Sequence, residues 1–406
     1  MEAVLVTNGP GELYSWAQPV LRVLRELYPD IKVSISLVPD QFISGSEAEV
    51  AGGFGADTVT THKDFMTLLA TGRVPVNLGD DTGFVLSLGG NVQMALRLAK
   101  SLGYPTYRYS FVPSWNRRLS KLFVHDERAE RRARRLGAPR DKLECVGNLV
   151  ADAVGQSSPV QDIGTPHIML MAGTRDAFSI LLIPFMIALA DTLGQRFPQA
   201  TFVWPVSQLL DPKTVAAGIA GEEKDYLGGM AGQQEGDSII TPNGVHLRMV
   251  PDTERHAHMR AADTAVTIPG TNTLELGIAG VPSVVMLPMN KPEVIPLEGI
   301  GHWLGLIPII GIPLKRHAVK LFVEGLNIPV SLPNRFSGED LMLEVKGKVS
   351  VAQIAREVTG LLENGAELSR RRERLLETMP KAGAAERLVR AIMSDFRDES
   401  ENLSEP

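Results

Sequence analysis

The chain has 406 residues, a length that exceeds one typical domain and predicts two to three units that together bury a large core. Hydrophobic residues make up 44% and charged residues 22% of the sequence, as in ordinary globular proteins. The net charge of -6 provides no general attraction to polyanions, so we expect no nucleic-acid partner.

The single cysteine, Cys145, excludes an internal disulfide and any metal site built from several cysteines. The N-terminus carries neither a basic leader nor an apolar segment long enough for export. We therefore expect a cytoplasmic protein.

The first half alternates short apolar runs with amphipathic segments. The predicted strands are 4–6, 33–38, 85–88, 106–110, 122–124 and 143–146. The predicted helices are 13–27, 46–53, 92–102 and 127–136. Such alternation predicts a parallel sheet with helices on both faces. A loosely patterned stretch with serine, glycine and proline follows at 155–166 and predicts a linker.

The loop at residues 7–12, Thr-Asn-Gly-Pro-Gly-Glu, follows the first strand and opens the first helix. Its glycines lack the G-x-G-x-x-G spacing, which argues against a nicotinamide dinucleotide site. The plain alternative is a tight turn in which Glu12 is favoured at the helix N-terminus.

A second alternating series begins at residue 167 and predicts a second unit of the same kind. Its predicted elements are 167–172, 178–197, 201–204, 246–250, 253–261 and a strand, loop, helix and strand at 266–287. The predicted fold class is therefore α/β, with two doubly wound Rossmann-like domains facing a cleft. The predicted boundaries are 1–155 and 166–350 for the domains, 351–396 for C-terminal helices and 397–406 for a disordered tail.

The loop after the first strand of the second series contains Gly173, Thr174 and Arg175. Small residues let a ligand approach the backbone, and the guanidinium fork of Arg175 suits a phosphate or a carboxylate. The alternative is a surface ion pair between Arg175 and Asp176.

Further along, His256 and His258 lie two residues apart near a predicted helix start. This spacing places them on different faces of the helix, whereas a metal pair would need positions i and i+4. We therefore expect surface histidines and no metal cofactor.

The segment 266–287 carries the strongest functional signal. At its junction Gly270 follows a proline, and Thr271, Asn272 and Thr273 offer hydroxyl and amide donors at a helix start. The helix macrodipole adds partial positive charge there, which predicts a diphosphate site. The alternative is a hydroxyl-capped helix after a buried strand, since threonine and asparagine are ordinary N-cap residues.

Three motifs in the C-terminal half resemble, in the same order, those of the lipid-A-disaccharide synthase family, inverting glycosyltransferases of the GT-B architecture. Residues 172–175, Ala-Gly-Thr-Arg, resemble the family's Gly-Ser-Arg loop, and residues 269–275, Pro-Gly-Thr-Asn-Thr-Leu-Glu, resemble its Ser-Gly-Thr-x-Thr-Leu-Glu motif. Residues 331–334 resemble its Ser-Leu-Pro-Asn motif. In the first half, Gly11-Glu12 and the Val-Gly-Asn segment at 146–148 resemble family segments more thinly.

The resemblance implies a UDP-sugar donor site in which Glu275 holds the ribose hydroxyls. It places Arg175 and residues 271–273 on the diphosphate, within loops that also contain Gly173, Thr174 and Gly270, and it places Asn334 close to the sugar. It implies no metal, because Arg175, the loop donors and the helix dipole stabilise the leaving diphosphate.

The catalytic base is where the chain departs from the family. The family carries an aspartate shortly after the strand that matches 85–88, whereas this chain has Asn91 there. An amide has no basic lone pair near neutral pH, so Asn91 cannot act as a general base. Glu12, Asp80 and Asp81 are the candidate replacements, and the sequence does not choose among them.

The resemblance implies an inverting glycosyltransferase that moves an N-acetylglucosamine-type sugar from a UDP-sugar to a lipid-linked or otherwise amphipathic acceptor at the cytoplasmic membrane face. Two alternatives stay open. A UDP-sugar 2-epimerase would share the architecture and would need no acceptor. A non-catalytic sugar-nucleotide or lipid-binding protein would have kept the donor pocket and lost the base, a hypothesis that Asn91 favours.

Peripheral membrane contact is predicted from the apolar patch at 303–310, Trp-Leu-Gly-Leu-Ile-Pro-Ile-Ile, with Lys315, Arg316 and Lys320 close by in the sequence. The alternative is a buried segment between the domains. The sequence leaves the oligomeric state open, and a homodimer is one option.

Overall fold

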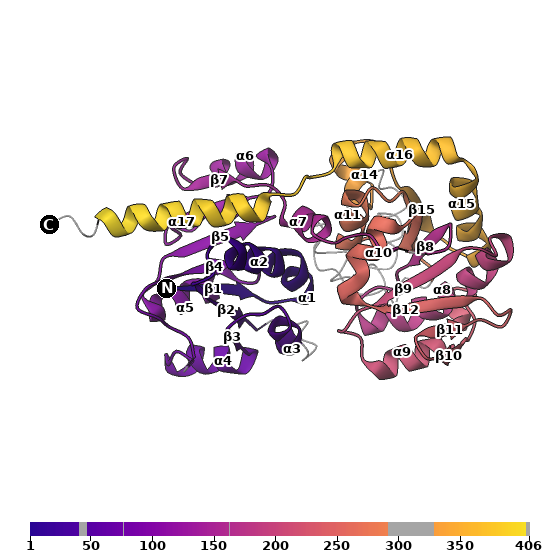
Figure 1. The fold of residues 1–406 in the computed structure, drawn as a ribbon, viewed down its shortest axis with the longest axis horizontal. Helices are drawn as coiled ribbons and strands as arrows, with labels where there is room; N and C mark the ends of the chain where they lie inside the picture. The colour runs from indigo at the N-terminus through magenta and orange to yellow at the C-terminus, as the bar shows by residue number, and fades with distance from the viewer. Residues whose placement is uncertain (40–46, 76, 162, 291–328, 403–406) are drawn as a thin grey trace, which may run out of the picture. The chain divides into compact units, whose positions relative to one another are not determined.

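The computed structural model describes residues 1–39, 47–75, 77–161, 163–290 and 329–402. They form two compact α/β units (Figure 1), and each is described here by itself. Unit 1 comprises residues 1–156 and the chain from residue 380 onward, and unit 2 comprises residues 157–379. The apolar patch predicted at 303–310 and its neighbouring cations lie outside the described residues.

Unit 1 is built on a parallel sheet of seven strands in the order β3-β2-β1-β4-β5-β6-β7. The strands are β1 (Glu2–Thr7), β2 (Lys32–Leu37), β3 (Thr58–Thr60), β4 (Gly83–Ser87), β5 (Thr106–Ser110), β6 (Lys121–Val124) and β7 (Leu143–Cys145). Strand β1 is buried along its whole length, as expected for a central strand covered on both faces. The strand order reverses between β1 and β4, which makes this pair the switch point of the sheet.

The helices of unit 1 follow the predicted alternation. They are α1 (Pro10–Glu12), the π-helical turn η1 (Leu13–Ala17), α2 (Gln18–Leu27), α3 (Glu47–Gly52), α4 (His62–Thr71), α5 (Val92–Leu102), α6 (Glu127–Arg135), α7 (Leu149–Gly155) and α17 (Ala384–Asn402). Local signals set several of their ends. Thr61 and Asp64 form a capping box at the start of α4, and Gly72, with a φ of 73°, ends it.

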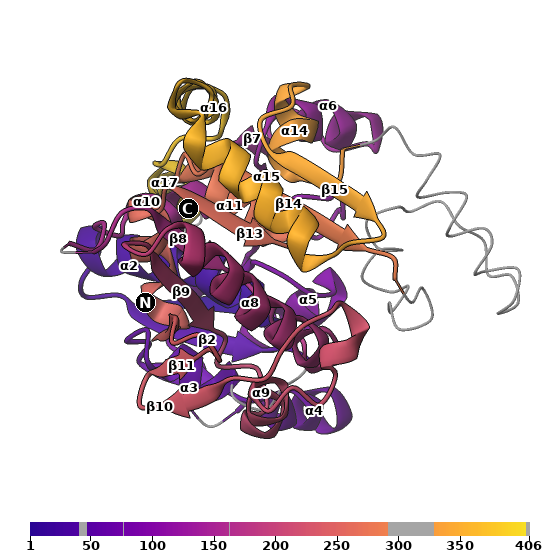
Figure 2. The same ribbon diagram turned by 90° about the vertical axis from the view of Figure 1, so that its right-hand side faces the viewer.

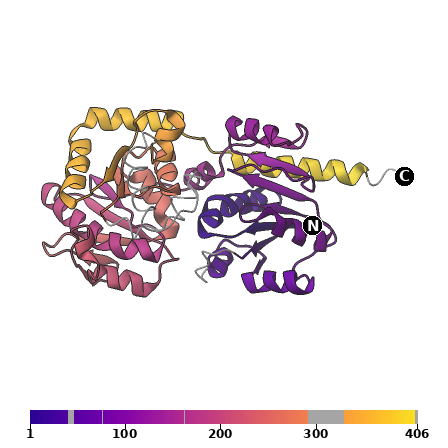
Figure 3. The same cartoon turned by 180° about the vertical axis from the view of Figure 1, so that it is seen from behind.

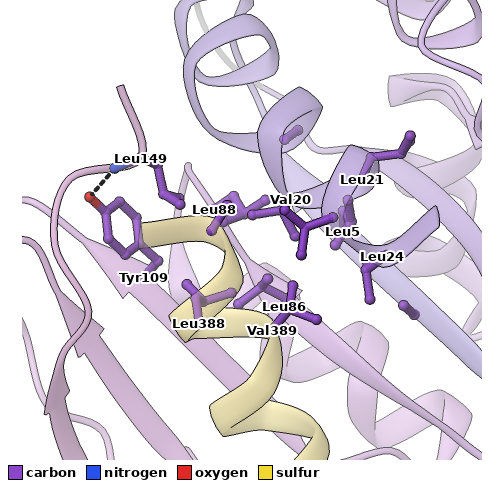
Figure 4. Packing of buried hydrophobic residues seen from close by; sticks show 14 of the residues in the cluster. Leu5, Val20, Leu21, Leu24, Leu86, Leu88, Tyr109, Leu149, Leu388 and Val389 are labelled. Atoms are coloured by element: carbon purple, nitrogen blue, oxygen red, sulfur yellow. Dashed lines mark hydrogen bonds between the residues drawn. The ribbon is translucent and has the colours of Figure 1, made fainter. Parts of the chain in front are cut away.

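The last helix, α17, belongs to the core of unit 1. Leu388 and Val389 lie in the same buried cluster as Leu86 of β4 (Figure 4), and Figure 3 shows the helix beside the strands of this unit. The carboxylate of Asp152 in α7 accepts hydrogen bonds from the backbone amides of residues 383–385, at 2.6, 3.0 and 3.2 Å. Asp152 thereby satisfies amides at the start of α17 that a helix leaves without internal partners.

Unit 2 is built on an eight-stranded sheet in the order β10-β11-β12-β9-β8-β13-β14-β15. The strands are β8 (His167–Leu170), β9 (Thr201–Val206), β10 (Gln233–Glu235), β11 (Ser238–Ile240), β12 (His246–Pro251), β13 (Thr264–Thr267), β14 (Ser283–Pro288) and β15 (Leu343–Gly347). The pairs β10–β11 and β11–β12 are antiparallel and the other pairs are parallel. The switch point of this sheet lies between β8 and β13.

The helices of unit 2 are α8 (Asp176–Arg196), α9 (Pro212–Ile219), the 3-10 turns η2 (Lys224–Tyr226) and η3 (Asp252–Glu254), α10 (Arg255–Ala261), α11 (Thr271–Ile278), α14 (Leu332–Ser337), α15 (Val351–Glu363) and α16 (Gly365–Thr378). Helices α8 and α15 pack side by side over one face of the sheet (Figure 2). In the described part of the chain, α8 is the one helix long and apolar enough to cross a membrane. Because 78% of its most apolar window is buried, it has the burial of a core helix.

The C-terminal helices are divided between the two units. Residues 351–396 are predicted as one C-terminal segment, but α15 and α16 pack within unit 2 whereas α17 packs within unit 1. Residues 397–402 of the predicted disordered tail belong instead to α17, which continues through Asn402, and residues 403–406 lie outside the described residues.

Candidate functional site

The two loops that the sequence predicts as a phosphate site lie next to each other at the switch point of unit 2. One loop follows β8 and contains Gly173, and the other follows β13 and contains Ile268. A β-carbon on Gly173 would lie 3.5 Å from Cδ1 of Ile268. Gly173 has a φ of 85°, a left-handed conformation that favours glycine. The geometry therefore brings the loops together where open α/β sheets bind their ligands.

Two helix N-termini open at this position. Helix α8 begins directly after Arg175, and α11 begins directly after Gly270. The side chains of Thr174, Arg175 and Thr271 are exposed, and that of Asn272 is partly exposed. Amides at helix N-termini and an arginine together form a positive, donor-rich surface, which suits a diphosphate.

Thr273 has a structural role in the same loop. Its hydroxyl donates to the carbonyl oxygen of Gly270 at 2.8 Å and accepts from the amide of Leu332 at 3.1 Å. The side chain is fully buried. The hydroxyl proton is therefore already engaged within the fold, whereas Thr271 and Asn272 keep exposed or partly exposed side chains. The contact of Thr273 with a diphosphate stays a prediction.

Glu275 lies inside a buried ion-pair network. Its Oε1 accepts a hydrogen bond from Arg255 at 2.8 Å, and the same guanidinium donates to Asp252 at 3.0 Å. The Nε of Arg255 also lies 3.3 Å from Nε2 of His256. Glu275 is 1% exposed and Arg255 is 8% exposed. A ribose would reach Glu275 only by displacing the groups that cover it, so the predicted ribose contact stays a prediction.

Among the residues that the structure describes, this network holds the carboxylates of Asp252 and Glu275 on the guanidinium of Arg255. Burial raises the pKa of Asp252, and the charge of Glu275 raises it further, while Arg255 and His256 act in the opposite direction. Arg255 is therefore the group that makes two buried carboxylates tolerable at neutral pH.

His256 and His258 are both buried, so the expectation of surface histidines is wrong. His258 lies with its Nδ1 3.2 Å from Nε2 of His167, the first residue of β8, and the two rings are stacked at 5.3 Å. Burial, and then the charge of His258, lowers the pKa of His167 to about 4. Burial also lowers the pKa of His258. These rings are held in their neutral form.

This histidine pair predicts a loss of stability in mild acid. The folded protein binds protons less readily at His167 than the unfolded chain, whose histidine pKa is 6.5. The free energy of unfolding therefore falls as the pH is lowered from 6.5 towards 4. Protonation of His167 accounts for about 3 kcal/mol of this loss. Urea unfolding at several pH values measures it. The variant His167→Gln should flatten this profile, whereas His246→Gln, at an exposed histidine, should leave it unchanged.

Asn334 holds a loop of unit 2 together. Its Oδ1 accepts from the amides of Leu341 and Met342, at 2.9 and 2.8 Å. Its Nδ2 donates to the carbonyl oxygen of Met342 at 2.9 Å and to Glu344 at 3.1 Å. These bonds use its two donors and two acceptors. Asn334 therefore has a structural role between α14 and β15, and its contact with the sugar stays a prediction.

In unit 1, Glu12 lies at the carboxyl edge of the sheet, beside the switch point. A β-carbon on Gly89, in the loop after β4, would lie 2.4 Å from Oδ1 of Asn8 and 3.1 Å from Cγ of Glu12. The loops after β1 and β4 are thus in close contact. Glu12 is the one predicted catalytic residue whose side chain the structure places against the loops of this switch point.

The structure places the other two residues predicted as catalytic, Asn91 and Asp81, in different surroundings. Asn91 is the N-cap of α5, and its Oδ1 accepts from the amide of Gln93 at 2.9 Å. Asp81 lies two residues before β4 begins and next to Asp80, which pairs with the N-terminal amine at 2.7 Å. Because β1 and β4 are parallel, Asp81 lies at the amino edge of the sheet, opposite to Glu12. This placement argues against Asp81 as the base, and the identity of the base stays a prediction.

Sequence reasoning missed Arg255 and Asp252. The spacing of Asp252 and Arg255, three residues apart at a helix start, favours an ion pair and could have revealed that contact. The contact between Arg255 and Glu275 spans two helices, α10 and α11, and no local pattern predicts it.

No protein-family model matches the chain, and no curated protein matches it in sequence. The fold nevertheless matches solved structures over almost its whole length. A UDP-GlcNAc 2-epimerase from Neisseria meningitidis bound to UDP-GlcNAc is 13% identical, with a TM-score of 0.52 over 97% of this chain and 100% of the other. The S. aureus protein MnaA with UDP is 11% identical, with a TM-score of 0.52 over 97% and 96% of the chains.

A third match is a protein from Listeria monocytogenes, described provisionally as a UDP-N-acetylglucosamine 2-epimerase. It is 14% identical, with a TM-score of 0.53 over 98% of this chain and 97% of the other. Likeness at these identities establishes the fold alone. The predicted fold class is confirmed for the units themselves: both are Rossmann-like, each built on a mainly parallel sheet, and the architecture is GT-B-like.

Proposed function

We propose that the protein is an enzyme that binds a UDP-sugar at the carboxyl edge of the unit 2 sheet. The observation that carries this proposal is the contact of the loops after β8 and β13, which places two helix N-termini and the exposed Arg175 at one switch point. Similar structures with UDP and with UDP-GlcNAc support the choice of nucleotide.

The reaction that we propose first is epimerisation of the sugar at carbon 2. The matched structures named above with an enzymatic description are UDP-GlcNAc 2-epimerases. This reaction needs no acceptor, so it requires no second substrate site. It removes the hydrogen of carbon 2 and returns one on the opposite face.

Glycosyl transfer is the second candidate. The motif at residues 269–275, which resembles that of the lipid-A-disaccharide synthase family, and the position of Glu12 favour it. Glu12 would deprotonate the acceptor hydroxyl. A lipid-linked acceptor and contact with a membrane belong to this second proposal.

UDP-GlcNAc incubated with the protein in D2O separates these reactions. Epimerisation gives a 2-epimer that carries deuterium at carbon 2, in the absence of any acceptor. Transfer gives free UDP and a glycosylated product only when an acceptor is added. Binding of UDP-GlcNAc with neither product in either condition would indicate a non-catalytic sugar-nucleotide-binding protein. Absence of any UDP binding would overturn the donor site itself.

The variant Arg175→Ala should weaken UDP binding about 10- to 100-fold, because charge-assisted hydrogen bonds to phosphate contribute roughly 1.5–3 kcal/mol. Isothermal titration calorimetry with UDP measures the change. The matched control is Arg356→Ala, which removes an exposed arginine from α15 of the same unit. Equal losses in the two variants would point to a general charge effect and against a contact at Arg175.

A further inference from the structure

Arg108 is a half-buried arginine in β5, the strand next to the central strand β4 in the parallel sheet of unit 1. It lies in register with Ser87 of β4 and Leu122 of β6. Its neighbours along the strand, Tyr107 and Tyr109, belong to the core cluster on the opposite face of the sheet. Because side chains alternate along a strand, Arg108 points to the other face.

On that face Arg108 separates two apolar clusters. One cluster includes Val85 of β4 and Ala95 of α5, and the other includes Leu122 of β6 and Ala129 of α6. Strand β5 lies between β4 and β6, so the side chain of Arg108 begins between these clusters, and its Nε is buried. An apolar side chain would be the ordinary choice at such a position.

The described residues provide no counter-charge for Arg108. Its Nε is buried without a hydrogen-bond partner, and no ion pair or hydrogen bond of the guanidinium is formed within the described ranges. Burial lowers the pKa of Arg108, and no carboxylate acts against that effect. A partly buried cation without a partner costs free energy, so its presence needs another explanation.

The position of Arg108 along its strand points to a ligand. It lies level with Ser87, the last residue of β4, and thus close to the carboxyl edge where such sheets bind ligands. A planar guanidinium matches the geometry of a phosphate oxygen pair. We propose that Arg108 forms the base of an anion site in unit 1, which binds the phosphate group of a ligand other than the UDP-sugar of unit 2.

The test compares Arg108→Met with the wild-type protein by thermal unfolding at constant ionic strength. In the absence of phosphate, Arg108→Met should raise the melting temperature, because methionine fits the flanking apolar clusters without an unpaired charge. Inorganic phosphate at ten times its Kd should raise the melting temperature of the wild type by about 4 °C. It should not shift that of Arg108→Met.

Two further variants keep the test decisive. Arg108→Lys retains the charge but not the fork, so it should bind phosphate more weakly than the wild type while remaining folded. Arg22→Met removes an exposed arginine from α2 of the same unit and should retain the full phosphate shift. UDP affinity should be unchanged in Arg108→Met, which separates this site from the donor site of unit 2.

The phosphate group could belong to a soluble metabolite or to a lipid. Parallel titrations with glycerol 3-phosphate and with a short-chain phosphatidic acid below its micellar concentration distinguish the two. Stronger stabilisation by the first identifies a soluble phosphomonoester, and stronger stabilisation by the second identifies a lipid headgroup. The proposal is overturned if phosphate compounds do not stabilise the wild type, if Arg108→Met retains the shift, or if Arg108→Met lowers the melting temperature without ligand.

Discussion

Replacing Arg255 by alanine should lower the free energy of unfolding of unit 2 by about 3–5 kcal/mol, the usual cost of breaking a buried ion pair by removing one partner. The guanidinium bonds Glu275 at 2.8 Å and Asp252 at 3.0 Å, and all three side chains are buried. Without it, two carboxylates face each other in a medium that solvates them poorly. Urea unfolding at pH 7 measures the loss.

A matched control shows whether the loss of stability in Arg255→Ala comes from burial of the ion pair or from ion pairing as such. Arg248 pairs with Asp237 at 3.4 Å, but both side chains are more than half exposed. The variant Arg248→Ala should therefore cost less than about 1 kcal/mol, as is usual for surface ion pairs. If the two variants lose equal stability, the network around Arg255 has no special energetic role.

A double-mutant cycle of Arg255→Ala with Glu275→Ala tests the pairing directly. If the contact between these residues carries the effect, the double variant should be more stable than the sum of the single losses predicts. Additive losses would mean that each residue stabilises unit 2 through other contacts. The cycle also shows whether Glu275 can be removed without unfolding the unit, which any test of a ribose contact requires.

The alternation of the two units was predictable because strands such as β1, β4 and β8 are short, largely apolar runs between helical segments. The predicted helix 178–197 corresponds to α8 at 176–196, and the predicted strand 201–204 corresponds to β9 at 201–206. The hairpin strand β10, with the exposed sequence Gln-Gln-Glu, has no apolar signal and was missed. The return of α17 to unit 1 was not predictable either, since it depends on contacts with Asp152 more than 200 residues earlier.

The candidate site was predictable where its chemistry is local. Residues 173–175 and 270–272 each stand between a predicted strand and a predicted helix, so their position at the carboxyl edge of one sheet could be predicted from sequence. The roles of Thr273, Glu275 and Asn334 could not, because each side chain bonds to residues that only the fold brings near. The position of Asp81 likewise depends on strand direction. Glu12 and Asp81 were equal candidates from sequence, but they lie at opposite edges of the sheet.

For glycosyl transfer, the reaction in which we propose Glu12 as the base, replacing Glu12 by glutamine should reduce kcat at least 100-fold, since general acid-base groups contribute roughly 10²- to 10⁴-fold to a reaction rate. Glu12 lies against the loops at the carboxyl edge of unit 1, where a carboxylate can take a proton from a substrate. UDP affinity, which we assign to unit 2, should be unchanged, and the ratio of product to bound UDP-sugar measures the loss.

Asp81→Asn is the matched control, because it removes a carboxylate from the opposite edge of the same sheet. Full activity of Glu12→Gln, or an equal loss in Asp81→Asn, would show that Glu12 is not the base and that proton transfer relies on a residue outside this loop.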